Sequence, residues 1–127
     1  MRSLRVLVVE DDPMVGPLLA EVLEELGHVV VAVEADADAA VATARACRPD
    51  LMIVDIRLGA ASGVAAVRDI LRDGFVPHVF VTGDLLRNLE LGPGAVLIQK
   101  PYRRHDIVAA IARVTGGAAK RDEAALV

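Results

Sequence analysis

Short apolar runs alternate with longer amphipathic segments along most of the chain. Five runs are rich in Val, Leu and Ile and lack polar alternation, at residues 6–9, 29–33, 51–54, 79–81 and 96–98. Runs of this length and composition favour strands that are buried on both faces. The pattern therefore predicts a parallel sheet that is covered by helices on both sides.

The segments between these runs have helical periodicity. From Val15 to Leu26 the apolar positions form one helical face, which predicts a helix beginning near Met14. Pro17 is compatible with the first turn of that helix, and Gly27 suits its left-handed C-terminal cap. Further helices are expected over residues 38–47, capped by Asp36 or Asp38, over 63–72, capped by Ser62, and over 104–114, with a weaker one within 84–95.

Strand and helix in alternation predict a three-layer, doubly wound α/β fold with a five-stranded parallel sheet. A chain of 127 residues corresponds to about one domain. We expect this domain to occupy residues 1–115. The remaining residues, 116–127, are small and polar, and we expect them to form a mobile C-terminal tail.

Composition narrows the class of protein. Hydrophobic residues make up 54% and charged residues 25% of the chain, which excludes a disordered protein, and an aromatic content of 2% predicts an aliphatic core. The net charge of −4 argues against a nucleic-acid partner. The single Cys47 excludes an internal disulfide. No signal peptide or membrane-spanning run is recognisable, so a cytoplasmic protein without a membrane partner is expected.

Polar residues with chemical potential follow four of the five expected strands. Acidic residues 10–12 follow the first strand, Asp55 ends the third, Thr82 ends the fourth and Lys100 follows the fifth. The carboxyl ends of parallel strands share one edge of a sheet, where open α/β folds place their sites. We therefore expect these side chains to meet.

Clustered carboxylates repel each other unless a cation lies between them. Mg²⁺ suits a site made of a few carboxylates together with water and phosphate oxygens. A carboxylate can also attack phosphorus and form an aspartyl phosphate, whose charge a metal ion and a lysine would neutralise. The set predicts an aspartate that accepts a phosphoryl group.

These residues resemble the motifs of response-regulator receiver domains. The resemblance rests on four motifs in order, Val8-Val9-Glu10-Asp11-Asp12-Pro13, Ile53-Val54-Asp55, Phe80-Val81-Thr82-Gly83 and Lys100-Pro101-Tyr102, and covers about residues 4–115. It implies a flavodoxin-like sheet with strand order 2-1-3-4-5. The resemblance also implies Asp55 as phosphoacceptor, Thr82 and Lys100 as ligands of phosphoryl oxygens, and a cis Lys100–Pro101 bond. The Mg²⁺ ligands that it implies are Glu10, Asp11, Asp55 and the backbone carbonyl of Arg57.

The motifs depart from the common receiver pattern in two places. Leu97 stands three residues before the lysine, where many receivers carry a switching aromatic residue, and this is similar to a subgroup with a Phe-Ala-Thr-Gly motif. Asp84 follows Gly83, where that subgroup has an apolar residue or Tyr. One hypothesis is that Arg57 and Asp84 form a pair that partly gates the site, and the alternative is two solvated side chains. Likewise, residues 103–105, Arg-Arg-His, are either a partner surface or a solvated turn.

The function expected from these observations is that of a single-domain response regulator, not a turnover enzyme. It would take a phosphoryl group from a phosphohistidine on a histidine kinase or a histidine phosphotransfer protein. It would then signal by protein contact or act as a phosphate sink. Two alternatives are a receiver-like adaptor that works without phosphorylation and a Mg²⁺-dependent phosphohydrolase with an aspartyl nucleophile. Arg57 argues against the hydrolase, because such enzymes usually have a second Asp at that position.

Overall fold

A computed structural model describes residues 2–83 and 90–126, and side chains up to residue 116. Its main sheet has five parallel strands in the order β2-β1-β3-β6-β7. In chain order the strands are β1 (Arg5–Val9), β2 (Val29–Glu34), β3 (Leu51–Asp55), β6 (His78–Thr82) and β7 (Val96–Gln99). The three-layer fold and the strand order 2-1-3-4-5 predicted from the sequence are confirmed.

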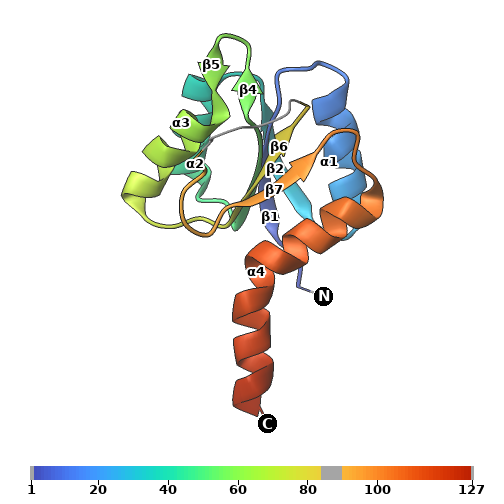
Figure 1. Cartoon of the computed structure of the whole chain (residues 1–127). Coiled ribbons are helices and arrows are strands. Elements are labelled where there is room, and N and C mark those ends of the chain that lie inside the picture. The colour runs from blue at the N-terminus through green and yellow to red at the C-terminus, as the bar shows by residue number, and fades with distance from the viewer. Residues whose placement is uncertain (1, 84–89, 127) are drawn as a thin grey trace.

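The helices cover both faces of the sheet (Figure 1). Helices α1 (Val15–Glu25) and α4 (Arg104–Leu126) lie on one side, and α2 (Ala37–Cys47) and α3 (Gly63–Ile70) on the other. Along β1, Val6 and Val8 pack into the core under α1 and α4, whereas Leu7 and Val9 pack under α2 and α3. Because both sets are buried, the strand is apolar throughout, which is the pattern that predicted it.

Local sequence accounts for most helix boundaries. Asp36 caps α2 by accepting a hydrogen bond from the N–H of Ala39 at 2.8 Å, and Ser62 caps α3 in the same way at Ala65. Gly27 has the expected left-handed conformation, with φ +95°. Helix α3 ends at Ile70 and continues as a 3₁₀ turn over Leu71–Asp73, close to the predicted end.

Helix α4 departs from the prediction. The sequence predicts an end at about Val114, followed by a tail of small and polar residues. Two glycines also stand at positions 116 and 117, and each is unfavourable in a helix by roughly 1 kcal/mol. The structure continues the helix to Leu126, so this boundary was wrong. The second half of α4 projects away from the body of the domain (Figure 1). Mobility of the segment stays a prediction.

Two regions depart from the alternation of sheet strands and helices, one after β3 and one after β6. After Asp55 the chain forms a small antiparallel hairpin, β4 (Arg57–Leu58) with β5 (Ala61–Ser62), which the sequence did not predict. The weak helix predicted within 84–95 falls partly on residues 84–89, which lie outside the described residues. Residues 90–95 form turns and irregular backbone.

Candidate functional site

The structure brings the predicted side chains together at the carboxyl edge of the sheet. Asp55 is the last residue of β3 and Thr82 the last of β6, and Glu10 and Lys100 directly follow β1 and β7. Glu10, Asp55 and Thr82 are buried, with 6%, 8% and 4% of their surface exposed. Polar and ionisable side chains that are buried at the ends of strands require hydrogen-bonding or charged partners.

Lys100 provides the charge that this edge needs. Its Nζ lies 2.8 Å from Oε1 of Glu10 and 2.7 Å from Oδ2 of Asp55. Burial opposes the charge of Lys100, but the two carboxylates outweigh it and hold the pKa of the ammonium above its ordinary value. Burial raises the pKa of Glu10, and the hydrogen bond from Lys100 counteracts part of this rise. The backbone places the lysine, because its N–H donates to the carbonyl of Thr82 at 2.6 Å.

The three consecutive acids after β1 have three different partners. Glu10 faces Lys100, as described above. Asp12 accepts hydrogen bonds from the N–H groups of Met14 and Val15 at the start of α1, which lower the pKa of its carboxyl. Asp11 accepts a hydrogen bond from the N–H of Gly59 at 2.9 Å, across 48 positions of sequence. The helix-capping role that suits any acid near a helix start is therefore taken by Asp12, which leaves Glu10 and Asp11 for the site.

The carboxylates form an arrangement that suits a hard divalent cation. Glu10, Asp11 and Asp55 each offer one oxygen, and these three oxygens lie within 4.8 Å of one another. An all-oxygen set of this size, with room left for water or phosphate oxygens, matches the preference of Mg²⁺. The carbonyl of Arg57, also predicted as a ligand, stays a prediction; the N–H of Arg57 donates to Oδ1 of Asp55 at 3.0 Å.

Close backbone packing holds the phosphoacceptor candidate in place. The N–H of Ile56 donates to the carbonyl of Val81 at 2.9 Å, and the N–H of Gly63 donates to the carbonyl of Ile56 at 2.7 Å. A Cβ atom on Gly63 would lie 2.0 Å from the carbonyl oxygen of Asp55. Sequence reasoning treated Gly63 only as a helix start and missed its role here. The signal that could have found it is the position of two glycines, Gly59 and Gly63, within eight residues of Asp55.

Of the two residues that depart from the common motif, Leu97 lies within the described residues and Asp84 does not. Leu97 lies on the edge strand β7, where it pairs with Phe80 of β6, and 37% of its surface is exposed. Tyr102, two residues after Lys100, is half-buried and packs against the core under α1 and α4; burial raises the pKa of its hydroxyl. Asp84 lies outside the described residues, so the hypothesis of an Arg57–Asp84 gate stays a prediction.

The basic run at the start of α4 has partners within the chain. Arg104 forms an ion pair with Glu25 of α1, and Asp106 accepts a hydrogen bond from the N–H of Arg103 at 2.8 Å. Asp106 also lies 3.3 Å from Nε2 of His105, so an acid offsets the unfavourable cations in this first turn. The choice between a partner surface and a solvated turn stays a prediction.

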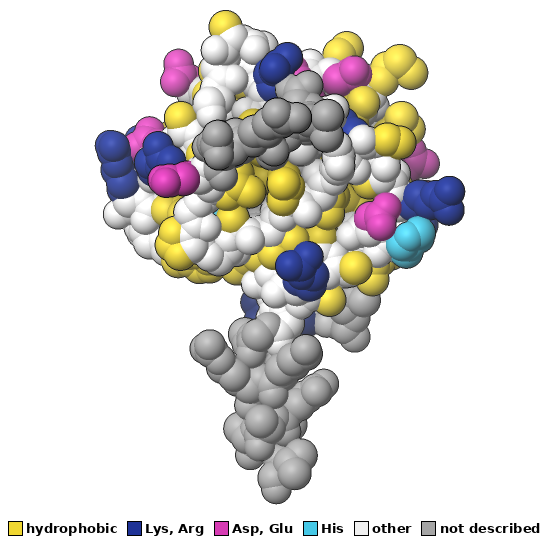
Figure 2. All heavy atoms as spheres, in the orientation of Figure 1, with side chains coloured by type: hydrophobic (Ala, Val, Ile, Leu, Met, Phe, Trp, Pro, Cys, Tyr) yellow, Lys and Arg dark blue, Asp and Glu magenta, His cyan; other side chains and the backbone are white. Residues whose placement is uncertain are grey.

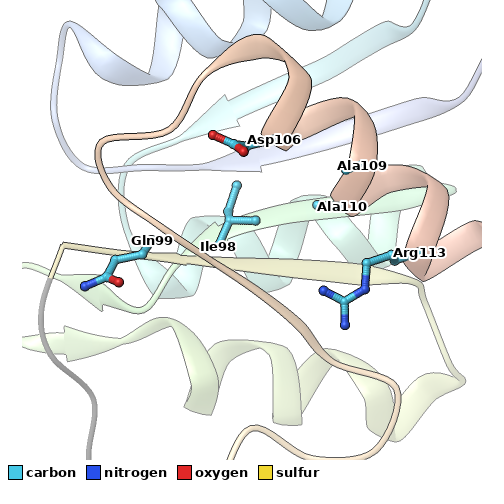
Figure 3. A pocket seen from close by; sticks show the side chains of 6 residues that line it. All are labelled: Ile98, Gln99, Asp106, Ala109, Ala110 and Arg113. Carbon is cyan, nitrogen blue, oxygen red and sulfur yellow. The ribbon is translucent and has the colours of Figure 1, made fainter.

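A hollow of about 260 Å³ lies between β7 and α4, and Glu10, Asp11 and Asp55 are not among the residues that line it. Figure 3 shows the side chains that line it: Ile98, Gln99, Asp106, Ala109, Ala110 and Arg113. On the face shown in Figure 2, Lys and Arg side chains are interspersed with Asp and Glu and form no continuous basic surface. That view agrees with the acidic net charge of −4.

Comparison with known proteins identifies the family. The model of the response regulator receiver domain matches residues 6–112, so the chain belongs to this family. The chain is 36% identical over 112 residues to the phyllosphere-induced regulator PhyR of Methylorubrum extorquens, covering 85% of this chain and 42% of that protein. It is 30% identical over 118 residues to protein CcdB of Bacillus subtilis, covering 88% of this chain and 98% of that protein.

A solved structure shows the same fold. The response regulator PhyR from Brucella abortus superimposes with a TM-score of 0.83 at 28% identity, covering 98% of this chain and 52% of that one. The chain thus spans about half the length of the PhyR proteins that it matches. Within residues 2–83 and 90–126, no helix is long and apolar enough to cross a membrane.

Proposed function

We propose that this receiver accepts a phosphoryl group on Asp55 from a phosphohistidine on a histidine kinase or a histidine phosphotransfer protein. The observation that carries the proposal is the double contact of Lys100 with Glu10 and Asp55, beside three carboxylate oxygens within 4.8 Å of one another. A solvated surface cluster would not bury Glu10 and Asp55 around an ammonium group.

The reaction is a transfer between two side chains. An oxygen of Asp55 attacks phosphorus, the new P–O bond forms, and the P–N bond to the donor imidazole breaks with its electron pair returning to the nitrogen. Lys100 neutralises the anionic oxygens of the transferring group, and Thr82, at the end of the adjacent strand, hydrogen-bonds to one of them. Glu10, Asp11, Asp55 and the Arg57 carbonyl would hold Mg²⁺, which supplies further charge neutralisation when bound.

The proposed output is contact with a protein partner or the draining of phosphate from a kinase. In the relative CcdB the matched segment makes up 98% of the protein, so a domain of this kind can form nearly a whole regulator there. The PhyR relatives, of which the chain covers about half, show that the same domain also occurs within longer regulators.

A small phosphodonor such as acetyl phosphate with Mg²⁺, followed by intact mass, tests the proposal. We expect one added phosphoryl group in the wild-type chain and none in Asp55→Ala or after chelation of the metal. Asp73→Ala is a matched control, because Asp73 is an exposed acid in the 3₁₀ turn after α3 and should leave the adduct unchanged. No adduct in the wild type would favour the adaptor, and multiple turnover of a phosphoester would favour the phosphohydrolase.

A further inference from the structure

The β4–β5 hairpin lies at the same edge of the molecule as the acidic cluster. Gly59 and Ala60 form its turn, between the pairs Leu58–Ala61 and Arg57–Ser62. Gly59 has φ +60°, a conformation that suits a two-residue hairpin turn and that side chains other than Asn or Asp rarely adopt. The base of the hairpin is anchored next to Asp55, because the N–H of Gly63 donates a hydrogen bond to the carbonyl of Ile56. The hairpin therefore has a defined position relative to the phosphoacceptor.

The tip of this hairpin contacts the loop that carries the acids. The N–H of Gly59 points at Oδ2 of Asp11, with a separation of 2.9 Å. Asp11 is exposed and lies on a loop, unlike Glu10 and Asp55, which are buried beside Lys100. Asp11 is thus the member of the predicted ligand set whose rotamer the core does not hold.

The contact has a direct consequence for cation binding. A backbone N–H on one carboxylate oxygen fixes the rotamer of the side chain and leaves the other oxygen, Oδ1, for a metal ion. An exposed side chain loses rotamer freedom when it binds a ligand, and holding it in place beforehand reduces that loss. Groups that hydrogen-bond to metal-binding residues commonly contribute roughly 10- to 100-fold in metal affinity.

We propose that the N–H of Gly59 is a positioning group that holds Asp11 ready for a divalent cation, and that the β4–β5 hairpin in turn responds to the cation. This inference rests on the proposed Mg²⁺ site. Coupling of two binding events is reciprocal, so a cation that uses Asp11 must stabilise the hairpin by the same factor by which the hairpin strengthens cation binding. Exposed residues of the hairpin, Arg57 and Gly59 through Ser62, would then differ in mobility between the free and the metal-bound receiver.

Titration calorimetry with MgCl₂ on the wild type, Gly59→Pro and Gly59→Ala tests the positioning role. Gly59→Pro removes the N–H and, because proline holds φ near about −65°, also changes the backbone of the turn. We expect Mg²⁺ affinity to fall roughly 10- to 100-fold, and the amide exchange described below separates the loss of the N–H from the change of the turn. Gly59→Ala is the matched control, because it keeps the N–H and its Cβ would meet nothing within 4 Å, so that only the positive φ is strained. Its affinity should stay closer to that of the wild type. Equal affinities for the wild type and Gly59→Pro would overturn the inference.

Amide exchange measured by NMR tests the same contact without altering the hairpin. We expect the Gly59 amide to exchange more slowly in Mg²⁺ than in its absence, and to lose its protection in Asp11→Ala. Asp12→Ala is the control, because Asp12 bonds to the start of α1 and should leave the Gly59 amide unchanged. Rapid Gly59 exchange in the wild type with or without Mg²⁺ would contradict the inference.

The two proposals fail differently. A wild-type chain that does not bind Mg²⁺ at all would refute the metal site of the proposed function. A wild-type chain that binds Mg²⁺ while Gly59 exchange is insensitive to the metal would refute only the positioning role. Should Gly59→Pro not fold, which circular dichroism would show, the exchange measurements decide alone.

Discussion

The two ends of the sheet bury their ionisable side chains differently. At the carboxyl end, Glu10 and Asp55 are buried beside the ammonium of Lys100. At the amino end, His28 is buried against a backbone group and His78 against an aromatic ring. His28 and His78 have only 5% and 0% of their surface exposed. Nδ1 of His28 accepts a hydrogen bond from the N–H of Leu4, and Nδ1 of His78 lies 2.8 Å from the carbonyl of Val76. One end buries its ionisable side chains in a cluster around one ammonium group, and the other end gives each imidazole its own contact with a backbone group.

The end that carries the candidate site and the opposite end therefore bury their ionisable side chains in different ways. Charges that are buried in a cluster are stable only as a set, so adding or removing one charge changes the rest. A neutral imidazole with a backbone partner can be buried on its own. The expected responses to mutation and pH therefore differ between the two ends.

The largest effect is expected from Gly63→Ala at the carboxyl end. The new Cβ would lie 2.0 Å from the carbonyl oxygen of Asp55, a backbone atom that cannot move aside without displacing the strand end. We expect a loss of about 3 kcal/mol in the free energy of unfolding, measured with urea.

Gly74→Ala is the comparison at the amino end, in the turn before β6. A Cβ there meets nothing within 4 Å, and only its φ of +124° is unfavourable. We expect about 1–2 kcal/mol for this variant. Equal losses for both variants would mean that the carboxyl end is not more tightly packed than the amino end.

A smaller effect is expected when the central cation is removed. Lys100→Met leaves Glu10 and Asp55 adjacent without their ammonium partner, which should lower the free energy of unfolding at pH 7 by about 2 kcal/mol. Burial already raises the pKa of Glu10 in the folded state, and loss of Lys100 removes the hydrogen bond that opposes this rise. When the pKa of Glu10 is higher in the folded than in the unfolded chain, protonation of Glu10 favours the folded chain, and this stability is lost as the pH rises. The stability difference between Lys100→Met and the wild type should therefore shrink as the pH falls toward 4.5, the ordinary pKa of the Glu side chain.

The pH dependence of the deficit distinguishes charge from packing. Arg113→Met on α4 removes a cation of similar size away from the acidic cluster and serves as the control. A deficit in Lys100→Met that is the same at pH 4.5 and pH 7 would indicate lost packing rather than unpaired charge.

The smallest effect is expected from the pH response of His28. Burial lowers the pKa of this imidazole below its ordinary value of 6.5, so the unfolded chain binds the proton more readily than the folded one. Stability should therefore fall as the pH drops below about 6.5, by about 1 kcal/mol if the bond from Leu4 is lost. His28→Asn offers the Leu4 N–H an acceptor that does not titrate, and its stability should depend less on pH between 7 and 5. An unchanged slope would place the response elsewhere.

The sheet and the edge where the site lies were predictable because both depend on short-range patterns. Apolar runs such as residues 6–9 and 51–54 show strands that are buried on both faces, and parallel strands end at a common edge. The meeting of Glu10, Asp55 and Lys100 follows from those two facts. Helix boundaries were predicted where a cap was encoded locally, as at Asp36, and were missed at α4, where the structure continues through two glycines.

By itself, the sequence determined the fold, the strand order through its resemblance to receivers, and the set of side chains at the carboxyl edge. Only the tertiary structure decided which partner each acid has. Glu10 pairs with Lys100, Asp12 bonds to the backbone at the start of α1, and Asp11 bonds to the N–H of Gly59. The physical reason is range. A strand end is set by neighbouring residues, whereas the partner of a carboxylate depends on backbone groups that the fold brings close, such as the N–H of Gly59, 48 positions from Asp11.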